Sequence, residues 1–310
     1  MYDVIGDVHG QGGKLRALLG AMGYIERHGT WRAPLGRQAV FVGDLIDRGP
    51  EQLAVIEIVR RMVEAGQARV VLGNHEFNAI GFLERSPKSG KHYRPRSDRN
   101  RAQHARFLAE VGEDSALHRE WVDWFKTLPL ALDLKGIRVA HGWWDTASVE
   151  ALDRVRPAHD GSPMSAAFLE ACHDDASPLM LARKRVTCGV EWDLPEGSWV
   201  VSKEGQRHPE ARIAVWRHWT DRLREVALVP QGSLDSVPDI AIPEELRMPP
   251  VDGSPILFGH HWFSGPVRLE TPKVACLDWS AAKDGRRVAY RWDGEAELTH
   301  DRLIAVGGSV

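Results

Sequence analysis

The chain has little cysteine, no long apolar run and almost no net charge, and each shortage excludes a class of protein. The three cysteines, Cys172, Cys188 and Cys276, form no Cys-x-x-Cys pair, which argues against a disulfide framework and favours a reducing compartment. No apolar run is long enough to span a bilayer. The net charge of −3 argues against a general nucleic-acid binder, because such proteins are usually basic.

What the chain does contain is typical of a globular α/β protein. With 310 residues, 43% hydrophobic and 27% charged, it can form one large domain or two small ones. Short apolar runs predict strands at 2–5, 39–42, 70–72, 137–140 and 256–258, with closing strands within 269–279 and 287–292. Helical spacing predicts helices at 14–22, 51–65, 77–83, 103–111 and 116–125. The strand–helix–strand order between 39 and 72 predicts parallel strands.

Five of the predicted strands lead into small residues followed by Asp, His or Asn. The five stretches are Gly6-Asp7-Val8-His9-Gly10, Gly43-Asp44-Leu45-Ile46-Asp47-Arg48-Gly49, Gly73-Asn74-His75-Glu76, His141-Gly142 and Gly259-His260-His261. Open α/β sheets bind ligands at the carboxyl ends of their strands. Carboxylate, amide and imidazole ligands suit Mn, Fe or Zn better than calcium or a thiolate site. Taken alone, the second stretch is equally consistent with a solvated turn whose aspartate caps a helix.

The ordered motifs G-D-x-H-G, G-D-x-x-D-R-G, G-N-H-E, H-G and G-H resemble those of the calcineurin-like metallophosphoesterases. The similarity is greatest to the phosphoprotein-phosphatase and diadenosine-tetraphosphatase branch, and it covers residues 1–145 and 255–280. The resemblance implies a four-layered α/β/β/α sandwich over residues 1–310, with residues 145–255 as an inserted cap. It also implies two divalent ions, with manganese expected and iron, zinc and magnesium as the alternatives.

The resemblance also implies a role for each motif residue. Asp7, His9 and Asp44 would hold the first metal, and Asp44, Asn74, His141 and His260 the second. His75 would be the general acid, Asp47 would orient it, and Arg48 and Asn74 would bind substrate. Considered without the motif, Asp47 is a turn or cap residue and Arg48 a surface ion-pair partner. Because His260 and His261 are adjacent, unlike the G-H-x-H of other branches, the choice of ligand between them stays open.

The expected reaction is hydrolysis of a phosphoester without a covalent phosphoenzyme. Two divalent cations about 3.5–4 Å apart can hold a bridging hydroxide and neutralise the phosphoryl oxygens. The leading substrate is a phosphomonoester, including phosphoserine, phosphothreonine or phosphotyrosine on a protein. A dinucleoside polyphosphate such as diadenosine tetraphosphate is the alternative, and a non-catalytic binding module of the same fold is the remote one. We expect a cytoplasmic protein that binds neither membranes nor nucleic acids in general, since removing residues 2–9 as a signal would delete two ligands.

Three features leave their role open. Eight Lys and Arg residues lie within 85–106, and they form either a solvated loop or a rim that steers anions towards the site. The second phosphate-binding arginine of this family has four candidates here, Arg183, Arg185, Arg212 and Arg217. The tryptophans of segment 145–255 are predicted to be core residues rather than stacking platforms for a ligand.

Overall fold

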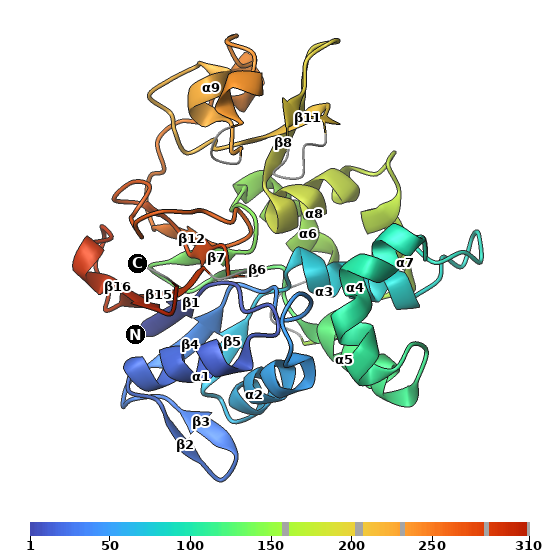
Figure 1. Cartoon of the computed structure of the whole chain (residues 1–310), viewed down its shortest axis with the longest axis vertical. Helices are drawn as coiled ribbons and strands as arrows, with labels where there is room; N and C mark the ends of the chain where they lie inside the picture. The colour runs from blue at the N-terminus through green and yellow to red at the C-terminus, as the bar shows by residue number, and fades with distance from the viewer. Residues whose placement is uncertain (157–160, 202–206, 230–232, 282–284, 309–310) are drawn as a thin grey trace.

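The computed structural model describes residues 1–156, 161–201, 207–229, 233–281 and 285–308, and it contains two main β-sheets (Figure 1). The six-stranded sheet has the order β14-β15-β1-β4-β5, with β16 also paired to β15. Its strands are β1 (Tyr2–Ile5), β4 (Gln38–Phe41), β5 (Ala68–Val70), β14 (Asp278–Trp279), β15 (Arg286–Trp292) and β16 (Leu303–Val306). The four-stranded sheet has the order β13-β12-β7-β6. Its strands are β6 (Ala131–Asp133), β7 (Arg138–Ala140), β12 (Ile256–Phe258) and β13 (Val274–Cys276).

The register of both sheets brings the ends of the predicted strands together. β1, β4 and β5 are parallel, with Ile5 paired to Phe41 and Phe41 to Val70, as the βαβ pattern predicts. In the second sheet β7, β12 and β13 are also parallel, with Phe258 paired to Cys276. The loops that carry the five motifs therefore leave the carboxyl ends of aligned strands.

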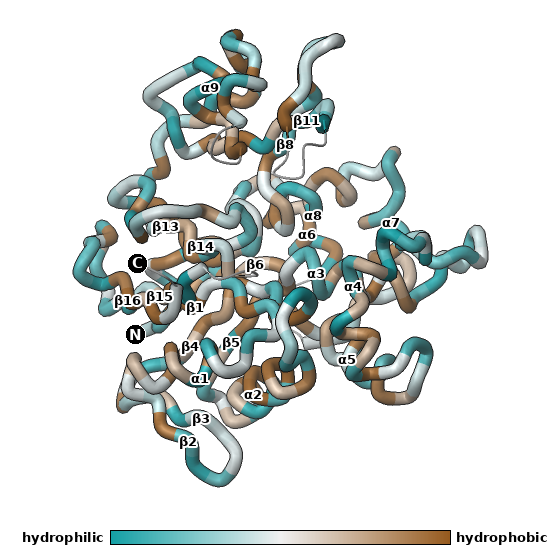
Figure 2. The backbone as a smooth tube through the Cα atoms, in the orientation of Figure 1, coloured by the Kyte–Doolittle hydropathy of each residue, from teal (hydrophilic) through white to brown (hydrophobic). Residues whose placement is uncertain are grey.

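Helices flank the sheets. α1 (Gly12–Ala21) packs against β15 and β16, and α2 (Gln52–Glu64) packs against β5. α2 forms because Val55, Ile56, Val59 and Met62 recur on one buried face, and Figure 2 shows hydrophobic residues concentrated in this helix. α3 (Asn74–Leu83), α4 (Asp98–Val111) and α5 (Ala116–Thr127) follow to the right of the sheets in Figure 1. This arrangement confirms the predicted α/β sandwich.

Several predicted boundaries were wrong, and the reasons are local. α3 begins at Asn74 instead of residue 77, because the Glu76 carboxylate caps the helix by accepting the N–H of Gly73. α4 begins at Asp98 instead of residue 103, because the Ser97 side chain accepts the N–H of Asn100. Residues 98–106 of the basic segment are therefore helical and not a loop. β2 (Ile25–Arg27) and β3 (Thr30–Arg32) form a hairpin between α1 and β4.

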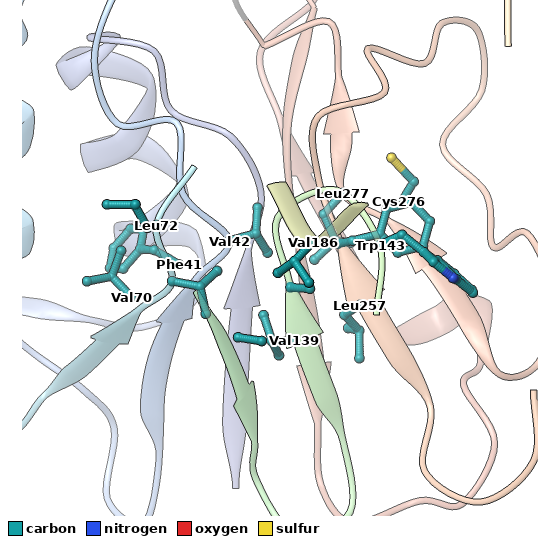
Figure 3. Packing of buried hydrophobic residues seen from close by; sticks show 14 of the residues in the cluster. Phe41, Val42, Val70, Leu72, Val139, Trp143, Val186, Leu257, Cys276 and Leu277 are labelled. Carbon is teal, nitrogen blue, oxygen red and sulfur yellow. The ribbon is translucent and has the colours of Figure 1, made fainter. Parts of the chain in front are cut away.

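One buried cluster joins the two sheets. Figure 3 shows Phe41 and Val70 of the first sheet on the left, with Leu72 just beyond β5. On the right it shows Leu257 and Cys276 of the second sheet, with Leu277 just beyond β13. Val42 and Val139 lie between them, and both are fully buried. Because apolar contact fixes the sheets against each other, the loops at their carboxyl ends are held on a rigid base.

Segment 145–255 is mostly helical at first and then forms small two-stranded sheets. Its helices are α6 (Thr146–Val155), α7 (Ala166–His173), α8 (Pro178–Cys188) and α9 (Leu223–Val226). Its strands are β8 (Val190–Asp193), β9 (Val200–Val201), β10 (Arg207–His208) and β11 (Glu210–Ile213), with β8 paired to β11 and β9 to β10. Trp216 is buried, as expected of a core residue, whereas Trp219 is 59% exposed. That the segment is a cap within a single domain stays a prediction.

Candidate metal centre

The motif loops from both sheets meet at one edge and are tied by backbone hydrogen bonds. The N–H of His9 donates to the carbonyl of Asp44 at 2.8 Å, and the N–H of Gly259 donates to the carbonyl of His141 at 2.9 Å. Only glycine fits at position 259, because a Cβ there would lie 1.9 Å from Oδ1 of Asp7. Motifs that are far apart in the sequence thus bring their side chains into one compact group.

Strained backbone marks the same loops. Of the ten non-glycine residues with positive φ in the described ranges, six lie in the motif loops: His9, Asp44, Asp47, Arg48, His260 and Trp262. Such conformations cost about 1–3 kcal/mol each and persist where the surrounding structure enforces them, often at functional sites. The concentration of strain here supports a functional role for this edge.

The first group of donor atoms surrounds His9. Nε2 of His9 lies 3.8 Å from Oδ2 of Asp7 and 3.5 Å from Oδ2 of Asp44. The other ring nitrogen, Nδ1, donates to the carbonyl of Ile46 at 3.0 Å, which leaves the Nε2 lone pair directed at the carboxylates. Nε2 of His75 also approaches Oδ2 of Asp44, at 3.9 Å, so His75 lies beside this group.

The second group surrounds Asn74. Its Oδ1 lies 3.1 Å from Nε2 of His141 and 2.8 Å from Nδ1 of His260. Nε2 of His141 is 3.2 Å from Oδ1 of Asp44, while its Nδ1 donates to the carbonyl of Val42 at 2.7 Å. Two sets of donor atoms that could hold a metal ion, His9-Asp44-His75 and Asp44-His141-His260, therefore share Asp44.

The charges of this group fit bound cations. Burial raises the pKa of the Asp7 carboxyl well above its usual range, and the charges of Asp278 and Asp44 raise it further. Burial lowers the pKa of His141, but Asp44, together with Asp7 and Glu76, raises this pKa overall to about 10. Nε2 of His260 is buried and has no hydrogen-bond partner among the described residues. A site that holds a proton on His141 and leaves a histidine nitrogen unpaired is suited to divalent ions.

Asp44 itself stays ionised. Burial raises the pKa of its carboxyl, but the charges of His141 and His75 outweigh burial and hold the pKa well below its usual range. The backbone N–H of His75 donates to Oδ1 of Asp44 at 3.0 Å, which fixes the carboxylate further. An ionised, immobile carboxylate between two donor groups is suited to bridging two ions.

His75 and Asp47 form the expected pair. Nδ1 of His75 lies 2.6 Å from Oδ2 of Asp47. Burial lowers the pKa of His75, but the Asp44 charge and the Asp47 hydrogen bond raise it above its ordinary value overall. Arg48 follows in the same loop with an exposed side chain, so it is free to meet an incoming anion.

The two adjacent histidines face different ways. His260 lies in the second donor group, whereas Nε2 of His261 lies 2.9 Å from the carbonyl oxygen of Gly142. The His261 ring packs against Trp216 and Phe258, with centroids 5.5 and 5.4 Å away. The geometry therefore brings His260, and not His261, to the candidate metal site.

The four candidate arginines differ in how fully other groups of the protein occupy their nitrogens. Arg183 donates to the carbonyl of Cys172, Arg185 lies 3.6 Å from Asp145, and Arg217 bonds to Glu270. Arg212, on β11, has buried Nε and Nη1 atoms without a hydrogen-bond partner in the described part of the chain, and its Nη2 lies 3.7 Å from Oε1 of Glu191. Arg183 has one such unpaired buried nitrogen, its Nε. The charge of Arg212 contributes, after burial, to lowering the pKa of both His260 and His261, so its guanidinium is close to the metal group.

Three buried residues of the site were not assigned a role from sequence. Glu76 accepts the backbone N–H groups of Asp44, Leu45, Ile46 and Gly73. His104 contacts Asp47, and Asp278 accepts the N–H of Trp262, two residues beyond His260. Glu76 ends the G-N-H-E motif, which is a usable signal. His104 and Asp278 are isolated in sequence from the motifs that they support.

Comparison with known proteins agrees with the motifs. Residues 2–189 match the sequence model of the calcineurin-like phosphoesterases. An asymmetrical bis(5'-nucleosyl)-tetraphosphatase PrpE from Oceanobacillus iheyensis is 34% identical over 137 residues, which are 44% of this chain and 53% of that protein. The PrpE of Halalkalibacterium halodurans is 47% identical over 74 residues, 24% of this chain and 30% of that protein. A cold-active protein-tyrosine phosphatase of a psychrophilic Shewanella has 18% identity and a TM-score of 0.47, covering 98% of this chain and 76% of that one.

The extent of these matches decides what they show. The chain spans about half the length, or less, of the curated relatives that it matches. None of the helices in the described ranges combines the length and apolar character that crossing a bilayer requires. The family match covers more than half of the chain and confirms the resemblance predicted from the motifs. The chain therefore belongs to the calcineurin-like phosphoesterase family.

Proposed function

We propose that the chain is a metal-dependent phosphoesterase with two divalent ions that share Asp44. The observation that carries this proposal is the pair of donor groups on either side of the Asp44 carboxylate. Asp7, whose Oδ2 lies 3.8 Å from Nε2 of His9, would hold one ion with His9 and Asp44, and His75 of that donor group is kept as the proton donor. Asp44, Asn74, His141 and His260 would hold the other ion. Oxygen and imidazole ligands without a thiolate favour manganese, with iron, zinc and magnesium as alternatives.

The ions would supply Lewis acidity towards the phosphoryl oxygens and an activated water nucleophile. The protein's own residues perform the remaining steps. His75, protonated and paired with Asp47, donates a proton to the departing oxygen. Arg48 presents a planar guanidinium that can bind two phosphoryl oxygens at once. Arg212 would support the same role, because it has unpaired N–H groups and its charge acts on His260 and His261.

For the substrate we favour a dinucleoside polyphosphate, which reverses the order expected from sequence. The tetraphosphatase names of the relatives support this choice. A cavity of about 380 Å³ is lined by Arg212, Trp262 and His208, together with Val200, Leu228, Glu191 and Glu210 among others. The rings of Trp262 and His208 beside an arginine suit a nucleobase next to a phosphate. A phosphomonoester is the second candidate, favoured because Arg96 and Arg101 in the basic segment are already paired with acids.

Replacing Asp44 tests the shared carboxylate. Asp44→Asn should weaken both metal sites together and abolish turnover, because the neutral amide cannot bridge two cations. Metal content by elemental analysis and activity with p-nitrophenyl phosphate measure the two effects. His260→Asn and His261→Asn form a matched pair, in which only the first should lose metal. One ion per fully active wild-type chain, or normal activity of Asp44→Asn, would contradict the two-metal mechanism.

A substrate panel tests the substrate class. The metal-loaded enzyme is assayed with diadenosine tetraphosphate, p-nitrophenyl phosphate, its bis-ester and phosphopeptides. The proposal expects the highest kcat/KM for diadenosine tetraphosphate, and Arg212→Met should raise KM for that substrate. Faster turnover of phosphopeptides would select the phosphomonoesterase instead. Tight metal binding without turnover of any ester would indicate the non-catalytic binding module.

A further inference from the structure

Two histidines hold the Asp47 carboxylate, one on each oxygen. Oδ2 lies 2.6 Å from Nδ1 of His75, and Oδ1 lies 2.8 Å from Nδ1 of His104. Asp47 is 2% exposed, and its backbone N–H donates to Oε1 of Gln52 at 2.6 Å. The proposed function uses His75 and Asp47 but gives no role to His104, which lies 57 positions further along the chain than Asp47.

His104 lies on α4 in a largely apolar pocket. It is 2% exposed, and its ring centroid is 5.5 Å from that of Phe82 and 5.0 Å from that of Phe107. Its Nε2 is buried, without a hydrogen-bond partner in the described ranges. Because an ionised carboxylate can only accept hydrogen bonds, the hydrogen must be on Nδ1. His104 therefore donates to Asp47 through Nδ1 and leaves its Nε2 without a partner among the described residues.

The second hydrogen bond changes what Asp47 can do. A carboxylate held at one oxygen can rotate about its Cβ–Cγ bond, whereas donors on both oxygens fix its plane. The Asp47 backbone is itself held at φ 67°, in the loop that follows Asp44. With the carboxylate fixed, Oδ2 stays opposite Nδ1 of His75. Nε2 of His75 then stays beside the metal group, 3.9 Å from Oδ2 of Asp44.

We propose that His104 is a positioning residue that fixes Asp47 and, through Asp47, holds His75 in the orientation that protonates the leaving group. The proposal rests on the proposed function, in which His75 is the general acid. The general acid His75, on α3, then depends on two further side chains, Asp47 in the Asp44–Arg48 loop and His104 on α4. His104 contacts neither the substrate nor the metal ligands, and its effect on the reaction passes through Asp47.

Replacing His104 by asparagine or by glutamine distinguishes this positioning role from a role in packing alone. The amide nitrogen of His104→Asn can reach the place of Nδ1 and keep the bond to Asp47, whereas that of His104→Gln extends towards the place of Nε2. His104→Gln should lower kcat for an alkyl phosphate roughly 10- to 100-fold, the range found when the hydrogen-bond partner that orients a metal-binding side chain is removed. The loss should be much smaller for p-nitrophenyl phosphate, whose leaving group needs little protonation. KM and the content of two metals should not change, and His104→Asn should stay within a few-fold of the wild type.

A control and a double variant complete the test. His118, whose ring centroid is 6.4 Å from that of His104, shares the pocket without contacting Asp47, so His118→Gln should show no dependence on the leaving group. In a His75→Asn background, His104→Gln should cause little further loss of kcat. Equal losses for both esters, equally slow Asn and Gln variants, or additive losses in the double variant would overturn the proposal. If His75→Asn alone lacks a leaving-group effect, the general-acid assignment fails instead.

Discussion

At the scale of single residues, replacing His75 should distinguish the loss of proton donation from the loss of metal binding. His75→Asn should retain both metals, because the predicted ligands are intact, yet slow hydrolysis by roughly 10²–10⁴-fold, the range typical of general acid–base catalysis. The loss should shrink as the leaving group improves from an alkoxide to p-nitrophenolate. Steady-state rates over a series of esters, with metal content measured in parallel, give the answer. A loss that is the same for every leaving group would argue that His75 acts in another way.

Glu76 shows how a buried carboxylate can hold a ligand loop. Its two oxygens accept four backbone N–H groups, including that of Asp44 at 2.9 Å. In Glu76→Gln the side-chain NH₂ takes the place of one accepting oxygen, and because it cannot accept a hydrogen bond, some of these N–H groups lose their partner. We therefore expect a loss of roughly 1–3 kcal/mol in the free energy of unfolding. Denaturant unfolding measures it, and metal content should fall with it. Glu84→Gln, at the end of the same helix and on a more exposed residue, is the control and should change little.

The sequence predicts those site residues that lie in short motifs. Asp7, Asp44 and Asn74 follow strands directly, so strand periodicity is enough to place them at one sheet edge. His104 lies in the middle of a helix and meets Asp47 only because α4 packs over the Asp44–Arg48 loop. Its sequence neighbours carry no motif, and its contact depends on tertiary packing alone. Arg212 could be named as one of four arginines, but only the structure shows that it has two unpaired buried nitrogens where Arg183 has one.

At the scale of elements, the arginines around the start of α4 are structural. Arg96 bonds to Asp114 and Glu113, and Arg101 pairs with Glu113, which ties the start of α4 to the α4–α5 turn. Arg94 bonds to Gln103 and Asn100 on α4. Neutralising Arg94, Arg96 and Arg99 together should therefore lower Tm, by roughly 2–4 °C for each kcal/mol lost from the free energy of unfolding. KM for diadenosine tetraphosphate should be nearly unchanged. Thermal unfolding and steady-state kinetics measure the two effects.

The opposite outcome would revise this view. A large increase in KM for diadenosine tetraphosphate but not for p-nitrophenyl phosphate would show that the segment clamps a polyphosphate. Arg99→Gln alone is the matched control, because no described ion pair involves its exposed side chain. It should leave both Tm and KM unchanged.

Helices with strong hydrophobic periodicity could be predicted from sequence, whereas elements that depend on pairing with distant segments could not. α2 was placed to within a residue at each end, because its apolar face recurs over thirteen residues. β6, with three residues, and β16, with four, were missed, since neither leads into one of the five motifs that marked the other short strands. Within 145–255, α6 and α8 pack against each other, and β8 pairs with β11 across 16 intervening residues. Those contacts join segments that have no repeat or motif in common.

At the scale of the whole molecule, metal binding and stability should be linked through His141. In the metal-free protein burial lowers the pKa of His141, but Asp44 and the other carboxylates raise it to about 10. A raised folded-state pKa stabilises the fold fully below the unfolded value of about 6.5 and loses that effect as pH rises to about 10. Tm of the metal-free protein should therefore fall over this range. Bound metal replaces the proton on His141, so Tm of the loaded protein should fall less.

The same linkage predicts that metal binding releases protons. Between pH 7 and pH 9 His141 must lose its proton when its Nε2 becomes a ligand, so titration with Mn²⁺ in weak buffer should release about one proton from this residue. Apparent metal affinity should therefore rise with pH over the same range. In Asp44→Asn the carboxylate that raises the pKa of His141 is gone, and both the proton release and the pH-dependent fall in Tm should diminish. Parallel Tm curves for the metal-free and loaded protein, without proton release, would show that His141 is not a ligand.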